Sequence, residues 1–170
     1  NVRVTKDVQY AVNLTELAAP RATLTVTYVN SAQSEIPCKP RSKVIDVTYD
    51  ELIDQCHWTY FRYIPQLGTT LIGATPHEIA AANMFNELDH PAQVDQLTDI
   101  DGGFGFGTLI LVPMSSEVQT TFVVALPVDV ITYDETENVY AYYLRIQKQS
   151  GIGRFPFEVT VDLPPGANVL

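Results

Sequence analysis

The two cysteines of the sequence, Cys38 and Cys56, stand eighteen residues apart. Cys38 lies in a loop bounded by Pro37 and Pro40, and Cys56 falls on the inward face of a predicted helix. A disulfide between them would join the loop to the core, and the chain-entropy relation assigns such a loop about 3 kcal/mol of stabilisation. Two buried free thiols are the alternative. The disulfide implies an oxidising compartment outside the cytoplasm.

A group of carboxylates offers the only pattern suited to a metal ion. Asp99 and Asp101 alternate ahead of a glycine, as in the middle of a calcium loop. An EF-hand is excluded, because Leu97 stands where an oxygen ligand is needed and Thr108 stands where a bidentate glutamate is needed. A non-EF calcium site built from Asp95, Asp99 and Asp101 is the candidate, and a polar turn is the alternative. A second candidate calcium site comprises Asp134, Glu135 and Glu137.

Tyrosines on two predicted strands are the candidates for a binding surface. Along residues 58–64 the side chains alternate between two aromatic faces, one with Tyr60 and the other with Tyr63. Tyr140 and Tyr142 share a face in the same way. Exposed tyrosines could stack on sugars or bury in a partner protein, whereas core packing on both faces is the alternative.

No catalytic constellation is found. Cys56 and His57 are adjacent on the predicted helix and project about 100° apart, so neither can activate the other. The glycine-rich stretch 103–107 leads into a strand rather than a helix, and no Lys or Arg lies within thirty residues of it, which argues against nucleotide binding. We therefore predict a protein that is not an enzyme, with no catalytic residue.

Composition and charge limit the classes of protein and of binding partner that the sequence allows. The 170 residues are 46% hydrophobic and 18% charged, which excludes a disordered chain or a coiled coil. The net charge is −10, and residues 63–141 hold eleven Asp and Glu but no Lys or Arg, so a nucleic-acid partner is not expected. No apolar run approaches the 18 or so residues that span a bilayer, so this chain is not expected to insert into a membrane.

Most of the sequence alternates with period two, which predicts half-buried strands. Residues 8–14 and 23–28 form a first antiparallel pair, and Pro113–Ser116 and Gln149–Gly153 are predicted hairpin connections. Further strands are expected at 58–64, 68–73, 107–112, 117–126, 138–148 and 155–163. We expect a mainly β fold, an antiparallel immunoglobulin- or fibronectin-like β-sandwich with one or two short helices in an insertion.

Two helices are predicted from their start signals. Thr48 and Glu51 form a capping box ahead of a two-turn helix over residues 49–56. Thr75 and the following proline begin a second helix over residues 75–88. Residues 75–107 then form a helical and loop insertion in a single domain, 1–170. Because the chain opens at Asn1 and closes after a Leu-Pro-Pro-Gly stretch, we expect a fragment of a longer protein.

Three stretches resemble the C-terminal part of the bacterial DUF4012 family. They are Tyr49-x-x-Leu52-x-x-x-Cys56-His57-Trp58-x-Tyr60-x-Arg62-x-Ile64-Pro65, then Gly107–Pro113, and then Tyr143-Leu144-x-Ile146-Gln147-Lys148-Gln149-Ser150-Gly151. Their order over residues 2–165 suits the family, whereas residues 75–107 depart from it. The resemblance implies an extracytoplasmic, envelope-associated bacterial domain of unassigned activity and carries over no catalytic residue.

These observations together predict a non-enzymatic interaction or spacer module of a bacterial cell-envelope protein, exposed at the cell surface or secreted. Its partner would be a protein or a cell-wall glycan. Two alternatives remain open. One is a carbohydrate-binding module that uses exposed tyrosines. The other is an accessory domain of an envelope enzyme, which would require a pocket that holds His90, Asp99 and Asp101.

Overall fold

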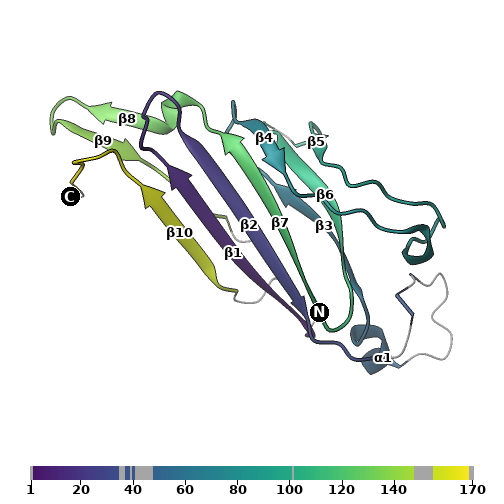
Figure 1. Ribbon diagram of the computed structural model, residues 1–170. Coiled ribbons are helices and arrows are strands. Elements are labelled where there is room, and N and C mark those ends of the chain that lie inside the picture. The colour runs from purple at the N-terminus through teal and green to yellow at the C-terminus, as the bar shows by residue number, and fades with distance from the viewer. Residues whose placement is uncertain are drawn as a thin grey trace.

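The computed structural model describes residues 2–34, 37–38, 40, 48–100, 102–147 and 155–168, and these residues are mainly β (Figure 1). The strands are β1 Val4–Asn13, β2 Arg21–Asn30, β3 His57–Tyr63, β4 Thr70–Ala74, β5 Asp95–Leu97, β6 Gly105–Val112, β7 Ser116–Ala125, β8 Ile131–Asp134, β9 Val139–Tyr142 and β10 Phe157–Asp162. The helical elements are α1 Tyr49–Ile53 and two 3-10 turns, η1 Ala81–Asn83 and η2 Val128–Val130.

The strands form a large sheet, a small sheet and a hairpin. The large sheet has the order β10-β1-β2-β7-β4, the small sheet has the order β3-β6-β5, and β8 pairs with β9. All pairs except β1 with β10 are antiparallel. The expectation of a mainly β fold with antiparallel sheets is thus confirmed.

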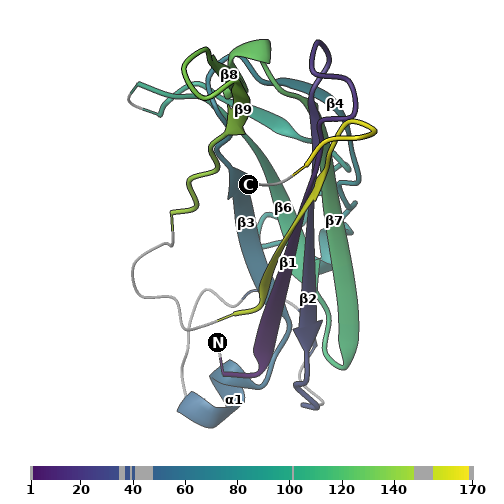
Figure 2. The same cartoon turned by 90° about the vertical axis from the view of Figure 1, so that its left-hand side faces the viewer.

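The large and small sheets pack face to face as a two-layer β-sandwich, seen from the side in Figure 2. Long strands β1, β2 and β7 turn alternate side chains inward, as the period-two pattern predicts. At the centre, the ring of Phe122 on β7 lies 5.8 Å from that of Phe61 and 5.9 Å from that of Tyr63, both on β3. Burial of this apolar layer is the main stabilising contribution.

A buried polar side chain joins the two layers at one end. Asn30, at the end of β2, is 1% exposed. Its Nδ2 donates to the carbonyl oxygens of Gln55 at 2.9 Å and Val112 at 3.2 Å, and its Oδ1 accepts from the Ala32 amide at 3.0 Å. The Asn30 side chain therefore links the end of β2 to Val112 at the end of β6 and to Gln55, the residue before the disulfide-bonded Cys56.

The connection at Pro113–Ser116 differs from the predicted hairpin. It carries the chain from β6 in the small sheet to β7 in the large sheet. Ser115 adopts a left-handed φ of 52° there, and its amide and hydroxyl both donate to the Ala32 carbonyl. β7 instead pairs with β2 from Asn30↔Ser116 to Arg21↔Ala125, which is longer than a β6–β7 ladder could be.

The last strand also differs from expectation. β10 pairs in parallel with β1, from Val8↔Phe157 to Asn13↔Asp162, rather than with the preceding strand. The strand predicted over 138–148 is shortened to β9 at Val139–Tyr142, which pairs with β8. The predicted hairpin connection at 149–153 lies outside the described residues. Strands β5 and β8 were not predicted.

Of the two predicted helices, the first begins where predicted but ends at Ile53 rather than at Cys56, and the second is wrong. α1 begins with the predicted capping box, in which Thr48 and Glu51 bond each other's backbone amides. The only helical element within residues 75–88 is the 3-10 turn η1. At Thr75 the chain continues alongside β7 instead, because the Thr75 amide donates to the Thr121 carbonyl and the Thr121 amide donates to the Thr75 hydroxyl. The described residues of 75–107 thus form loops, η1, β5 and the start of β6, and α1 precedes them.

One irregularity marks the outer strand β4. Its register against β7 shifts between Leu71 and Gly73, so that Ile72 bulges outward and is 52% exposed. Across the described ranges, no helix has the length and apolar character needed to cross a membrane.

Candidate functional site

The structure divides the four tyrosines of the predicted surface into two exposed and two inward-facing rings. Tyr60 and Tyr140 are 39% and 64% exposed. Tyr63 and Tyr142 pack against the hydrophobic core. Period-two alternation separates the two faces of β3 but does not tell which face meets the opposite sheet, and it is the Tyr63 face that does. Tyr142 shares a face with Tyr140 but lies at the base of the β8–β9 hairpin, where it packs on the core. Tyr63 and Tyr142 therefore do not belong to an exposed surface.

The inward tyrosines form a cluster of phenol groups with Tyr10 of β1. The Tyr10 and Tyr63 hydroxyl oxygens are 3.5 Å apart. Burial raises the pKa of Tyr10, Tyr63 and Tyr142 above the ordinary value, and the neighbouring phenols raise those of Tyr10 and Tyr142 further. These groups stay neutral and serve to satisfy one another inside the sandwich.

Tyr60 lies on the outer face of the small sheet. Its hydroxyl donates to Asp95 Oδ2 at 2.6 Å, linking β3 to β5 across β6. Burial, and next the hydrogen bond to Asp95, raise the pKa of Tyr60 to about 12. Its ring crosses β6 over Gly107, where a Cβ would lie only 2.7 Å from the ring edge, and the Arg62 guanidinium lies 5.7 Å from its centroid. Tyr60 is therefore held in place as a cross-strand tie.

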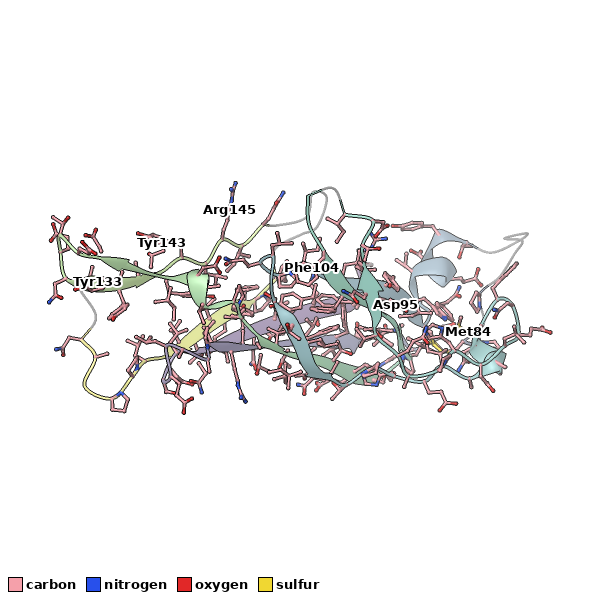
Figure 3. All side chains as sticks on the ribbon, turned by 90° about the horizontal axis from the view of Figure 1, so that it is seen from above. Met84, Asp95, Phe104, Tyr133, Tyr143 and Arg145 are labelled. Atoms are coloured by element: carbon pink, nitrogen blue, oxygen red, sulfur yellow. A yellow bond between two sulfur atoms is a disulfide. The ribbon has the colours of Figure 1, made fainter. Side chains whose placement is uncertain are left out.

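The β8–β9 hairpin carries an exposed aromatic pair. Tyr133 and Tyr140 face each other across the two strands, with ring centroids 4.9 Å apart and planes tilted by 43°. They are 49% and 64% exposed, and the hairpin projects beyond the end of the large sheet (Figures 1 and 3). We call Tyr133 and Tyr140 the hairpin tyrosines.

Local sequence shapes this hairpin. Asn138 adopts a left-handed φ of 56°, which asparagine tolerates, and its Oδ1 accepts the Tyr133 hydroxyl at 2.7 Å. Asp134 Oδ1 accepts the amides of Thr136 and Glu137 and closes the turn. At the base of the same face, Ile131 and Tyr142 pack on the core. The hairpin tyrosines are thus held by a rigid turn at one end and the core at the other.

The calcium candidate can be followed only in part, since Asp101 lies outside the described residues. The Asp95 carboxylate is bonded to Tyr60 and to the Gln93 amide at 3.4 Å, and Asp99 is exposed on the loop that follows β5. Within the part of the chain that the structure describes, no group of three or more His, Cys, Asp or Glu side chains could hold a metal ion. Asp134, in the second candidate calcium site, caps its own turn.

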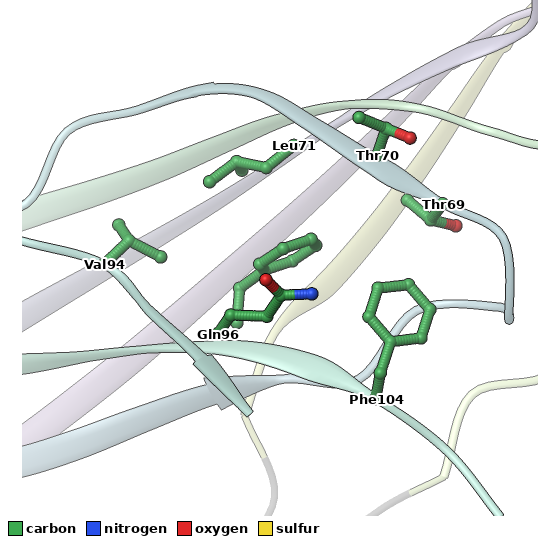
Figure 4. Close-up of a pocket in the computed structure, with 7 residues that line it drawn as sticks. Thr69, Thr70, Leu71, Val94, Gln96 and Phe104 are labelled. Atoms are coloured by element: carbon green, nitrogen blue, oxygen red, sulfur yellow. The ribbon is translucent and has the colours of Figure 1, made fainter. Parts of the chain in front are cut away.

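A pocket of about 390 Å³ opens between β4 and β5, at the side of the sandwich (Figure 4). It is lined by Thr69, Thr70, Leu71, Val94, Gln96, Phe104 and Phe106. None of these side chains titrates in the ordinary pH range. Neither Asp99 nor His90 lines it, so this pocket lacks the charged groups that the accessory-enzyme alternative requires. His90 instead pairs through its backbone with Ile79.

The two cysteines form the predicted disulfide. Cys38 and Cys56 are bonded, with Cα atoms 5.4 Å apart. Cys56 lies between α1 and β3 rather than on the helix, and it is 5% exposed. A bonded Cys56 offers no thiolate, and burial lowers the pKa of the adjacent His57. Cys56 therefore cannot act as the nucleophile of a Cys56–His57 pair.

Comparison with protein-family models, curated proteins and solved structures finds no match to this chain.

Sequence reasoning missed Tyr133, although a signal for it exists. Tyr133 and Tyr140 each lie two residues from the polar run Glu135–Asn138, one on either side of it. A turn centred on this run places the two tyrosines opposite each other. β8 is only four residues long, so its alternation is at the lower limit at which a strand can be recognised.

Proposed function

We propose that this chain is a non-enzymatic interaction or spacer module, immunoglobulin- or fibronectin-like, of a bacterial cell-envelope protein. The observation that carries the proposal is the exposed pair of hairpin tyrosines on a projecting, internally braced hairpin. Tyrosines are enriched in protein interfaces because they bury a large area at small entropic cost. A protein partner would cover both rings and meet the acidic turn with a basic rim.

The extracytoplasmic setting is supported by the Cys38–Cys56 disulfide, because such bonds persist in oxidising compartments. The resemblance to the envelope-associated DUF4012 family points to the same setting.

A photo-crosslinking amino acid at position 140 tests the protein-partner proposal. Tyr140 is replaced on the chain displayed at the bacterial surface, and covalent adducts are identified after illumination. The matched control carries the same group at Tyr49, which is 72% exposed on α1. An adduct of defined mass from position 140 and none from position 49 supports the proposal. Its absence at 140 in a folded, displayed protein contradicts it.

The same hairpin tyrosines also favour a second function, binding of a cell-wall glycan. Two exposed rings at 4.9 Å and a 43° tilt offer a surface on which a sugar ring can stack. With about 1 kcal/mol per ring, the double variant Tyr133→Ala, Tyr140→Ala loses about thirty-fold in affinity. Tyr49→Ala is the control. Calorimetry with soluble cell-wall fragments that gives no heat, or an unchanged affinity in the double variant, excludes this function.

A further inference from the structure

The first and last strands of the fold lie side by side and run in the same direction. β1 and β10 pair over six residues, from Val8↔Phe157 to Asn13↔Asp162. Because they are parallel, the start of β1 and the end of β10 lie at opposite ends of the ladder (Figures 1 and 2). A force that pulls these two points apart acts along the strands.

We propose that the parallel β1–β10 ladder is a mechanical clamp, which makes this module resist unfolding under load applied along its chain. The proposal deepens the spacer role proposed above. When strands are pulled along their length, every hydrogen bond of the ladder is loaded at once. When strands are pulled apart from one end, the bonds break one after another.

Two hydrogen bonds at the ends of the ladder fix which backbone groups bear the load. The Val8 amide donates to the Pro156 carbonyl at 3.2 Å, and the Leu14 amide donates to the Asp162 carbonyl at 2.8 Å. Successive residues of a strand point their N–H and C=O groups to opposite sides. The even-numbered residues of β10, including Thr160, therefore face β1, and Val159 faces away from it.

β1 is held more firmly than β10, so the ladder between them is where the load concentrates. β1 also pairs with β2 over ten residues, from Val4↔Asn30 to Asn13↔Arg21. Among the described strands, β10 pairs with β1 alone. At the start of β10, Phe155 packs against the core, and the Lys6 ammonium lies 4.2 Å from its ring centroid. Unfolding from the ends must therefore shear this ladder.

Single-molecule force spectroscopy in two attachment geometries tests the clamp on the unmodified strand sequence. In the first, the handles are attached at Val2 and Ala167, so the load shears the ladder. In the second, they are attached at Val2 and at an amino acid carrying the handle in place of Pro156, so the load peels β10 from its start. We expect an unfolding force several-fold higher in the first geometry at the same pulling speed. Equal forces in both geometries overturn the proposal.

Two proline variants locate the resistance in the ladder. Thr160→Pro removes an amide that faces β1 and divides the ladder, so the end-to-end unfolding force falls by about half. Val159→Pro places the proline where no described strand pairs, a position that edge strands accept, and leaves the force within the wild-type scatter. Equal losses in the two variants contradict the assignment. If Thr160→Pro does not fold, the comparison of geometries decides alone.

The disulfide supplies an internal check that the correct molecule is being pulled. Reduction frees the chain between Cys38 and Cys56, a separation of 18 residues, and lengthens the unfolded chain by about 60 Å. The force experiment involves no ligand and the crosslinking experiment no load, so either proposal can fail while the other stands.

Discussion

Asn30 connects the two layers of the sandwich through one side chain, and its replacement measures how much that connection contributes. Asn30→Ala removes two donors and one acceptor. It takes one hydrogen bond each from the carbonyls of Gln55 and Val112 and from the amide of Ala32. The side chain is 1% exposed, so water does not reach these groups without a change in packing.

The expected magnitude follows from the three lost hydrogen bonds. Each contributes about 1 kcal/mol net, so Asn30→Ala lowers the free energy of unfolding by about 3 kcal/mol. For a domain of this length, such a loss lowers the melting temperature by roughly 6–12 °C.

Equilibrium unfolding in urea, followed by the fluorescence of the single tryptophan Trp58, measures this loss. Asn13→Ala is the matched control, because Asn13 is exposed and its Oδ1 accepts from the amide and hydroxyl of its near neighbour Thr15. The control changes the free energy of unfolding by at most about 0.5 kcal/mol. A loss below about 1 kcal/mol in Asn30→Ala, at an unchanged denaturant slope, would show that this side chain does not tie the layers together.

Three further predictions concern the disulfide, the glycines of the sheets and the tyrosines. Replacing Cys38 and Cys56 by alanine lowers the free energy of unfolding by about 3 kcal/mol; unchanged urea midpoints would contradict this. Gly105→Ala costs about 2 kcal/mol, because the new Cβ would lie 2.6 Å from a backbone carbonyl of β3, whereas Gly73→Ala, with no atom within 4 Å, serves as its control in thermal melts. The unfolded chain loses phenol protons from about pH 10, while the folded chain retains them on its tyrosines of raised pKa, so stability falls as the pH rises above 10. The absorbance of the folded protein at 295 nm therefore rises at a higher pH than that of the unfolded chain. Coincident titrations of the folded and unfolded protein would exclude the raised pKa values. The tyrosines concerned are Tyr10, Tyr28, Tyr60, Tyr63 and Tyr142.

Local signals predicted the parts of the fold that local interactions decide. The alternation around Val8 and Val26 identified β1, β2 and their antiparallel pairing. Thr48 and Glu51 located the start of α1. In each case the deciding contacts lie within a few residues, or between strands adjacent along the chain.

The parts of the fold that were not predicted depend on pairing between segments distant in the sequence. The start signal at Thr75 describes a helix well, yet the hydrogen bonds to Thr121 extend the chain along β7 and outweigh the helical preference. The parallel position of β10 beside β1 depends on a partner about 150 residues away. The inward position of Tyr63 has the same kind of cause, because the face of β3 that meets Phe122 depends on where the opposite sheet lies.

The bulge in β4 has a consequence for molecules crowded together at high concentration. An outer strand with a straight row of free amides is a template on which another copy can polymerise into fibres. The shift between Leu71 and Gly73 interrupts that row on β4 and turns Ile72 out of line. A neighbouring chain cannot follow β4 in a regular register, so this edge guards the protein against aggregation.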